Sequence, residues 1–194
     1  MGSVLLVGPG NELKERKLGK IIDTFDIVAR INNGGNPRCM SGEYTDIVGT
    51  KIDIWFSFHT GCFIGNKQFS KKYKEVFLRP EAYDKYKNSE YSNLKSFSND
   101  ILDFTKNTLQ SFNGFNSVTT SGMNALFYLI KEYEDVSVCG FDGFKSGHWY
   151  ENMFVNNQNE SDKKVSKGPY GRHDGLREFE YFNYLKDSDV IKVI

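Results

Sequence analysis

Val4-Leu5-Leu6-Val7-Gly8-Pro9-Gly10, near the start of the chain, is the stretch that decides the fold. Four apolar residues followed by a glycine-proline turn are typical of a buried strand that ends sharply. Short apolar runs of this kind alternate with amphipathic segments along the rest of the chain. Strands that alternate with helices predict an α/β fold with a Rossmann-like layered sheet.

The remaining elements are predicted from hydrophobic spacing. Residues 121–133 form the clearest helix, because Met123, Phe127 and Ile130 recur at helical spacing. No repeat or linker divides the chain, so we expect residues 1–194 to form one catalytic domain. The expected strands are 3–7, 25–31, 53–58, 75–78, 136–140 and 190–194, and the expected helices are 12–22, parts of 79–113, 121–133 and 175–186. Residues 156–171 show no periodicity and are expected to form a mobile loop.

Composition restricts the classes of function. Hydrophobic residues make up 39% and charged residues 26% of the chain, which are ordinary values for a soluble globular protein. The 25 basic and 25 acidic residues cancel, which argues against a nucleic-acid or anionic-membrane partner. No apolar run is long enough for a membrane span or a signal peptide. Since Cys39, Cys62 and Cys139 lack metal-ligand spacing, we expect reduced thiols and a cytoplasmic location.

Two predicted strand-to-helix turns carry residues that suit an anionic ligand. Residues 8–11 form a small-residue turn after the first strand, but Leu13 occupies the third glycine position of the dinucleotide pattern G-x-G-x-x-G. An NAD-linked oxidoreductase is therefore weakly supported. Thr120 and Ser121 begin the clearest helix, where they either cap it or hold a phosphate or carboxylate.

Histidines supply the other candidates. His148 and His173 lie in polar, glycine-flanked loops, where side chains are either functional or simply solvated. His59 has no such polar neighbours and is expected to be structural. Residues 187–189 resemble a metal-binding D-x-D sequence, but they precede the last strand and are expected to form a solvated turn. No His, Cys or acidic cluster has ligand spacing, so a metal site is not expected.

Taken in order, these segments resemble the sialylmotifs of the eukaryotic-type sialyltransferases, glycosyltransferase family 29. Residues 4–13 and 22–32 are similar to the family's long motif, a V-G-N-S-G-N-L turn followed by I-D-x-x-D-x-V-x-R-x-N, and residues 45–51 resemble its end. Residues 120–141 resemble the short motif. The third motif, H-Y-W/Y-E-N, is similar to residues 148–152, and the very short motif, H-x-x-x-x-E, is similar to residues 173–178.

The resemblance implies a sheet of the glycosyltransferase type A variant and an inverting transfer of sialic acid from CMP-sialic acid to a glycan hydroxyl. It implies no metal ion and no other cofactor. His173 would be the general base, since an unperturbed histidine pKa of about 6.5 suits this role. His148 would help CMP to leave, and Glu178 would steady the loop that carries His173. The residues implied to contact the donor are Asn11, Asn32, Thr120, Ser121, Gly122, Gly140, Phe141 and Tyr150.

The sequence also departs from the family. Pro9 stands where the family's first turn asparagine is expected, and residues 60–115 show no resemblance. Ser3 and residues 131–133 lack the cysteine pair of the Golgi members, which fits a reducing compartment. With no anchor or stem in this sequence, we expect a compact microbial or viral member. Two alternatives stay open: transfer of another CMP-activated acidic sugar such as Kdo, and a CMP-binding module without catalysis.

Overall fold

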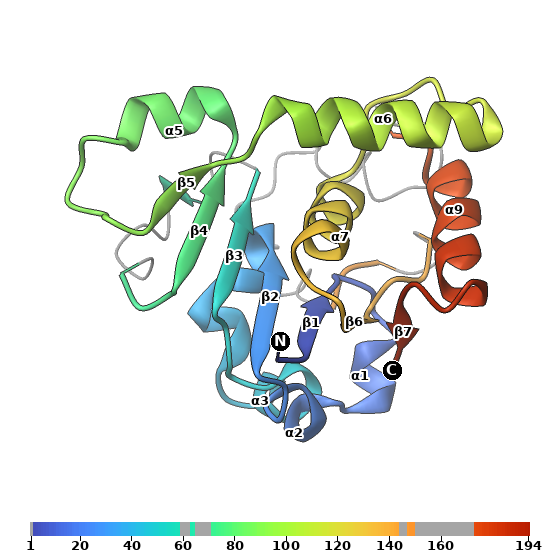
Figure 1. Ribbon diagram of the computed structural model, residues 1–194. Coiled ribbons are helices and arrows are strands. Elements are labelled where there is room, and N and C mark those ends of the chain that lie inside the picture. Colours follow the sequence, from blue (N-terminus) through green and yellow to red (C-terminus); the bar gives the residue numbers. More distant parts are fainter. Residues whose placement is uncertain (1, 59–62, 65–70, 144–146, 150–172) are drawn as a thin grey trace.

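One parallel sheet organises the protein. The computed structural model describes residues 2–58, 63–64, 71–143, 147–149 and 173–194. In this part of the chain seven strands pair in the order β5-β4-β3-β2-β1-β6-β7, all parallel (Figure 1). They are β1 (Val4–Val7), β2 (Ile27–Ile31), β3 (Ile54–Ser57), β4 (Glu75–Leu78), β5 (Leu94–Ser96), β6 (Val136–Cys139) and β7 (Lys192–Val193). The predicted α/β class with a Rossmann-like sheet is confirmed.

The strand order reverses beside β1. The chain builds outward from β1 to β5 and then returns to the opposite side of β1 as β6 and β7. The register pairs Val7 of β1 with Cys139 of β6, so the carboxyl ends of these strands lie side by side. Ligands of open α/β sheets bind at such a reversal, beyond the carboxyl ends of the strands. The fold therefore points to the turns that follow β1 and β6.

Helices cover both faces of the sheet. Buried contacts place α6, α7 and α9 on one face and α1, α2 and α3 on the other. In Figure 1 the strand arrows point toward the end of the molecule that α6 crosses. The helices are α1 (Leu13–Arg16), α2 (Gly19–Ile22), α3 (Tyr44–Val48), α5 (Pro80–Tyr86), α6 (Asn99–Asn113), α7 (Ser121–Glu132) and α9 (Gly175–Asp187), with 3-10 turns η1 (Asn32–Gly35) and η2 (Pro37–Met40).

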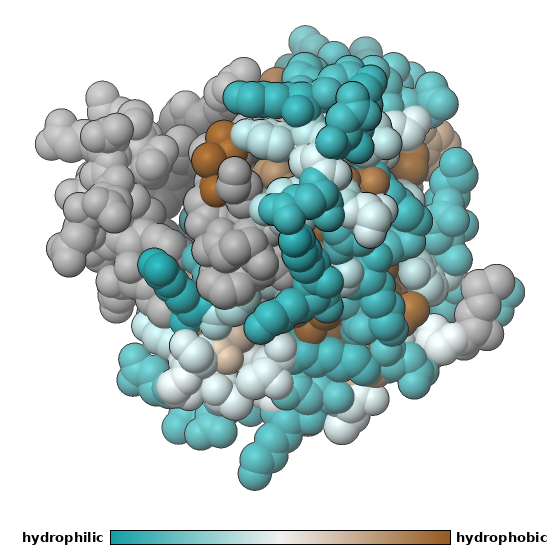
Figure 2. Space-filling view, turned by 90° about the vertical axis from the view of Figure 1, so that its left-hand side faces the viewer, coloured by the Kyte–Doolittle hydropathy of each residue, from teal (hydrophilic) through white to brown (hydrophobic). Residues whose placement is uncertain are grey.

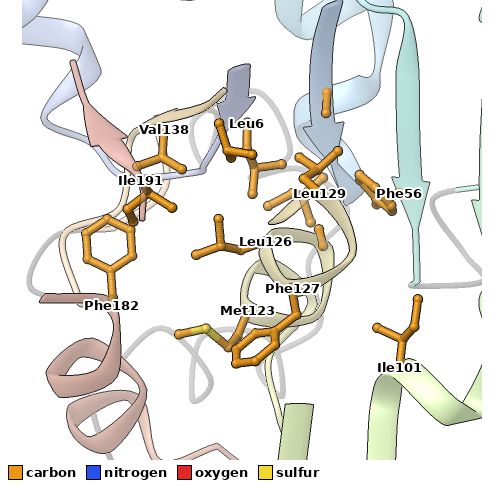
Figure 3. Close-up of a cluster of buried hydrophobic side chains, with 14 of the residues drawn as sticks. Leu6, Phe56, Ile101, Met123, Leu126, Phe127, Leu129, Val138, Phe182 and Ile191 are labelled. Atoms are coloured by element: carbon orange, nitrogen blue, oxygen red, sulfur yellow. The ribbon is translucent and has the colours of Figure 1, made fainter. Parts of the chain in front are cut away.

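The core on the α7 face fixes the position of that helix. Alternate residues of a strand point to opposite faces, so Leu6 packs toward α7 while Leu5 packs toward α1 and α2. Leu126 of α7 points toward the strands, as the close-up in Figure 3 shows, while Phe127 stacks on Tyr181 of α9 with ring centroids 5.5 Å apart. Truncating a fully buried leucine such as Leu126 to alanine costs about 2–5 kcal/mol. This packing holds α7 with its N-terminus at the carboxyl ends of the strands.

The prediction of one helix over residues 12–22 is wrong. Two four-residue helices, α1 and α2, take its place, and Lys17 between them has a φ of 50°. Gly19 begins α2. A larger residue would not fit at this position, because a Cβ there would lie 2.0 Å from the carbonyl oxygen of Thr45. The break between α1 and α2 therefore depends on the close approach of Gly19 to α3, which is a contact between residues far apart in the sequence.

The sheet edge also differs from the prediction. β5 lies inside the segment 79–113, for which only partial helix was predicted, because two of its three residues, Lys95 and Ser96, are exposed and give no hydrophobic pattern. β7 is shorter than the predicted strand 190–194. Figure 2 views the molecule from the β5 side, and the described residues on that face are mostly hydrophilic, as is usual where a sheet edge must avoid pairing with another chain. The predicted loop 156–171 lies outside the described residues.

Candidate active site

Two glycine turns meet at the reversal of strand order. The amide of Gly8 donates to the carbonyl of Cys139 (2.7 Å), and the amide of Gly10 donates to the carbonyl of Gly140 (2.8 Å). A Cβ on Gly8 would lie 2.3 Å from the carbonyl oxygen of Gly140, and Gly140 has a φ of +72°. Both glycines are therefore needed for the two turns to touch. Asn11 follows in the same turn, and its carbonyl accepts from the amide of Lys14 (3.1 Å).

The segment 147–149 lies along the turn after β1. His148 forms an antiparallel bridge with Gly10, and the amide of Trp149 donates to the carbonyl of Pro9 (2.9 Å). The fully buried indole of Trp149 also donates to the carbonyl of Gly8 (3.3 Å). Trp149 thus anchors the segment, and this anchor places His148 at the carboxyl end of β1.

Asn32 and Ser121 lie side by side. Asn32 follows β2 with a φ of 45°, a left-handed conformation that asparagine tolerates better than most residues. Its Nδ2 donates to Oγ of Ser121 (3.2 Å), and its carbonyl accepts from Nε1 of Trp55 (2.8 Å). The first residue of α7 is thereby linked to the end of β2.

Gly122 and Phe141 are in contact with each other. A Cβ on Gly122 would lie 2.9 Å from the ring of Phe141, which stacks on Phe182 of α9 with ring centroids 5.6 Å apart. Phe141 therefore joins the turn after β6 to both α7 and α9. Packing explains both residues, and a direct role of either in donor binding stays a prediction. Tyr150 lies outside the described residues.

Thr120 caps α7 and is held by a buried carboxylate. Its Oγ1 accepts from the amide of Met123 (3.1 Å) and donates to Oε2 of Glu178 (2.6 Å), while its amide donates to Oε1 of Glu178 (2.7 Å). The hydroxyl and the amide of Thr120, which could otherwise bind a sugar-nucleotide, are thus both hydrogen-bonded to Glu178. The backbone amides of Ser121 and Gly122 are the groups of this turn that suit an anion.

Burial perturbs the carboxyl of Glu178. The side chain is 4% exposed, and this burial raises the pKa of Glu178 to about 7, with a small further rise from Asp174. The two hydrogen bonds from Thr120 favour the ionised form and oppose the rise of the pKa. The carboxyl therefore changes charge near neutral pH.

His173 is fixed in one tautomer. Its Nδ1 lies 2.6 Å from the carbonyl oxygen of Val118. A carbonyl only accepts, so Nδ1 carries the proton, and Nε2 of the neutral ring keeps its lone pair. The ring is half-buried, which leaves it within reach of solvent and of a substrate. This is the arrangement that a general base needs.

His173 and Glu178 hold the same backbone segment. His173 bonds Val118 and Glu178 bonds Thr120, so the start of α9 is tied to the entry of α7. Val118 could not be recognised from the sequence, because any residue can supply a carbonyl. Among the described residues, no group of three His, Cys, Asp or Glu side chains is arranged to hold a metal ion. Nor does this part of the chain contain a helix long and apolar enough to cross a membrane.

Comparisons with known proteins identify the fold. No protein-family model matches the sequence, and no curated protein matches it. A crystal structure of a mammalian sialyltransferase superimposes with a TM-score of 0.62 and 17% identity, covering 100% of this chain and 68% of that one. A mammalian sialyltransferase in complex with Gal-beta-1-3GalNAc-ortho-nitrophenol gives 0.61 and 18%, covering 99% and 68%. The chain therefore has a sialyltransferase-like fold.

Proposed function

We propose that this protein is a sialyltransferase that moves sialic acid from CMP-sialic acid to a glycan hydroxyl, with inversion and without a metal ion. One observation carries the proposal: in a sialyltransferase-like fold, Val118 fixes the tautomer of His173 so that Nε2 is the basic nitrogen. His173 stands next to the entry of α7, where an anionic donor is expected to bind.

The reaction is a single displacement. The acceptor hydroxyl oxygen attacks the anomeric carbon of the sugar, and the bond from that carbon to the phosphate oxygen breaks. Nε2 of His173 takes the hydroxyl proton, and CMP leaves with the bonding electron pair. Attack opposite the leaving group inverts the anomeric centre. A well-placed general base accelerates such a step by about 10²–10⁴-fold.

The departing phosphate needs stabilisation from the protein. His148 stands beside Gly10 at the end of β1, and the N-terminus of α7 presents the amides of Ser121 and Gly122. The helix dipole and these amides favour negative charge by about 0.3–1 kcal/mol at an exposed site. Asn32, bonded to Ser121, is assigned to the nucleotide end of the donor together with Asn11.

The test is an assay with CMP-sialic acid and a galactoside. A galactoside is the first acceptor to try because a structural neighbour was solved with Gal-beta-1-3GalNAc-ortho-nitrophenol. We expect a sialylated product of inverted configuration by NMR, formed equally well in EDTA. Release of CMP from CMP-Kdo alone would favour the Kdo alternative. CMP binding without turnover of either donor would favour the non-catalytic module and contradict the proposal.

A further inference from the structure

A pocket that the donor site does not use lies between α6 and the segment entering α7. Its volume is ≈ 180 Å³, and its wall includes Lys106 of α6, Asn124 of α7 and Arg79, which follows β4. Val118 is also part of this wall, and its carbonyl is the acceptor for Nδ1 of His173. The pocket therefore shares a residue with the support of the proposed base.

The amide nitrogen of Asn124, in the pocket wall, has no acceptor among the described residues. Asn124 is 1% exposed, and its Oδ1 accepts from the hydroxyl of Thr119 (3.0 Å). No hydrogen bond from Nδ2 of Asn124 reaches another group in the described part of the chain. Buried amide groups are normally paired, and an oxygen atom bound in the pocket would supply the acceptor.

The charges in the wall select an anion. Arg79 and Lys106 line the pocket, and neither forms an ion pair with the residues that the structure describes. Among the wall residues that the structure describes, Asp103 is the one acidic side chain, so two positive charges and one negative charge leave an excess of one. A guanidinium binds the two oxygens of a carboxylate or sulfate in parallel. A singly charged oxyanion therefore fits both the charge and the Asn124 amide.

We propose that this pocket binds a singly charged oxyanion, a carboxylate or a sulfate, carried by the glycan acceptor. This inference rests on the proposed function and names the class of acceptor that the enzyme prefers. Because Val118 both lines the pocket and supports His173, an acceptor anchored there would present a neighbouring hydroxyl to the base.

The experiment compares three acceptors: a neutral galactoside, the same glycan carrying a uronic acid, and the same glycan carrying a sulfate ester. We expect one or both charged acceptors to show a KM about tenfold lower than the neutral one. Arg79→Met and Lys106→Met should remove this preference while the KM of the neutral acceptor and of the donor changes less than twofold. Lys131→Met, on the exposed side of α7, is the matched control and should keep the preference.

The outcomes separate this inference from the proposed function. Turnover of the neutral acceptor without any preference for a charged one would overturn the pocket assignment and leave the transferase proposal standing. If no acceptor reacts, the transferase proposal fails, and NMR titration with glucuronate and with sulfate still tests the pocket. A shift of the Asn124 side-chain amide that Arg79→Met abolishes would support an anion site, and no shift with either anion would overturn it.

Discussion

Two polar networks each hold a backbone segment of this protein. They differ in whether a side-chain nitrogen that can accept a proton remains without a hydrogen bond. The Arg30 network consists of Arg30 and Asp23, which hold residues 48–51 on the α3 face. The His173 network consists of His173 and Glu178, which hold residues 118–120 at the entry of α7. Both are built from residues that the resemblance to sialyltransferases singles out, yet they do different work.

The Arg30 network directs its hydrogen bonds at the segment it supports, although Nη1 of Arg30 is buried without a partner among the described residues. Arg30 is fully buried and donates to the carbonyls of Lys51 (3.0 Å) and Val48. The Asp23 carboxylate accepts from the amides of Thr50 (2.9 Å) and Lys51 (2.8 Å). Burial lowers the pKa of Arg30 to about 10, so it stays charged at neutral pH. This network therefore stabilises the fold.

In the His173 network, Nε2 of His173 makes no hydrogen bond to the described residues. Glu178 is buried and spends both carboxylate oxygens on Thr120. His173 is half-buried and uses Nδ1 for Val118, which leaves Nε2 for the proposed proton transfer. Burial thus separates the two roles within this network: the enclosed Glu178 fixes the backbone, and the half-exposed His173 is the candidate for catalysis.

Arg30→Ala is expected to have the largest effect, and it tests whether the Arg30 network stabilises the fold. It removes the donors of two buried carbonyls and leaves a cavity, so we expect the free energy of unfolding to fall by about 3 kcal/mol or more. Urea unfolding followed by circular dichroism measures this. Arg38→Ala, at an exposed arginine, should change stability by less than about 0.5 kcal/mol. A loss below about 1 kcal/mol for Arg30→Ala would refute the structural assignment.

Glu178→Gln tests whether the buried carboxyl of the His173 network makes the free energy of unfolding depend on pH. The folded pKa of Glu178, about 7, lies above the ordinary value of 4.5, so the folded state binds this proton more tightly than the unfolded state. The free energy of unfolding should therefore fall as the pH rises from about 4.5 to about 7, by roughly 3 kcal/mol, and this contribution should be level above pH 7. Denaturant titrations across this range should show a shallower fall in Glu178→Gln.

Glu180→Gln is the matched control for this measurement, because Glu180 is exposed on the same helix. It should keep the pH dependence of the wild-type protein. An identical slope in Glu178→Gln and the wild-type protein would mean that Glu178 does not titrate in this window.

Ser121→Ala gives the smallest effect and probes the proposed donor site, which adjoins the His173 network. It removes the hydroxyl that links α7 to Asn32 and is assigned to the donor. The loss of one hydrogen bond, about 1 kcal/mol, should weaken CMP binding about fivefold in calorimetry. Ser41→Ala, which also loses one bond, to the carbonyl of Arg38, should leave CMP affinity unchanged. Equal affinities for both variants would exclude Ser121 from the donor site.

The sequence predicted the features that depend on local pattern. The central strands follow from short apolar runs, and α7 follows from its helical spacing and the Thr120 cap. The break between α1 and α2 was not predicted, because it depends on the contact of Gly19 with Thr45. β5 was missed because pairing with β4, rather than its own composition, makes it a strand.

The candidate site was predicted in part, for the same reason. The motifs named Asn32 and Ser121, which the structure brings together, and they named His173. They could not show that Glu178, 58 residues away along the chain, engages Thr120. They also could not show that the carbonyl of Val118 sets the tautomer of His173, because a backbone acceptor has no sequence signature.

The central claim, that His173 is the base, is tested most directly by the single-turnover rate of sialyl transfer in His173→Ala. The account predicts that this rate falls by roughly 10²-fold or more, that CMP affinity stays within about twofold of the wild-type value, and that added imidazole restores part of the rate. A variant that folds, binds CMP and transfers sialic acid at the wild-type rate would contradict it.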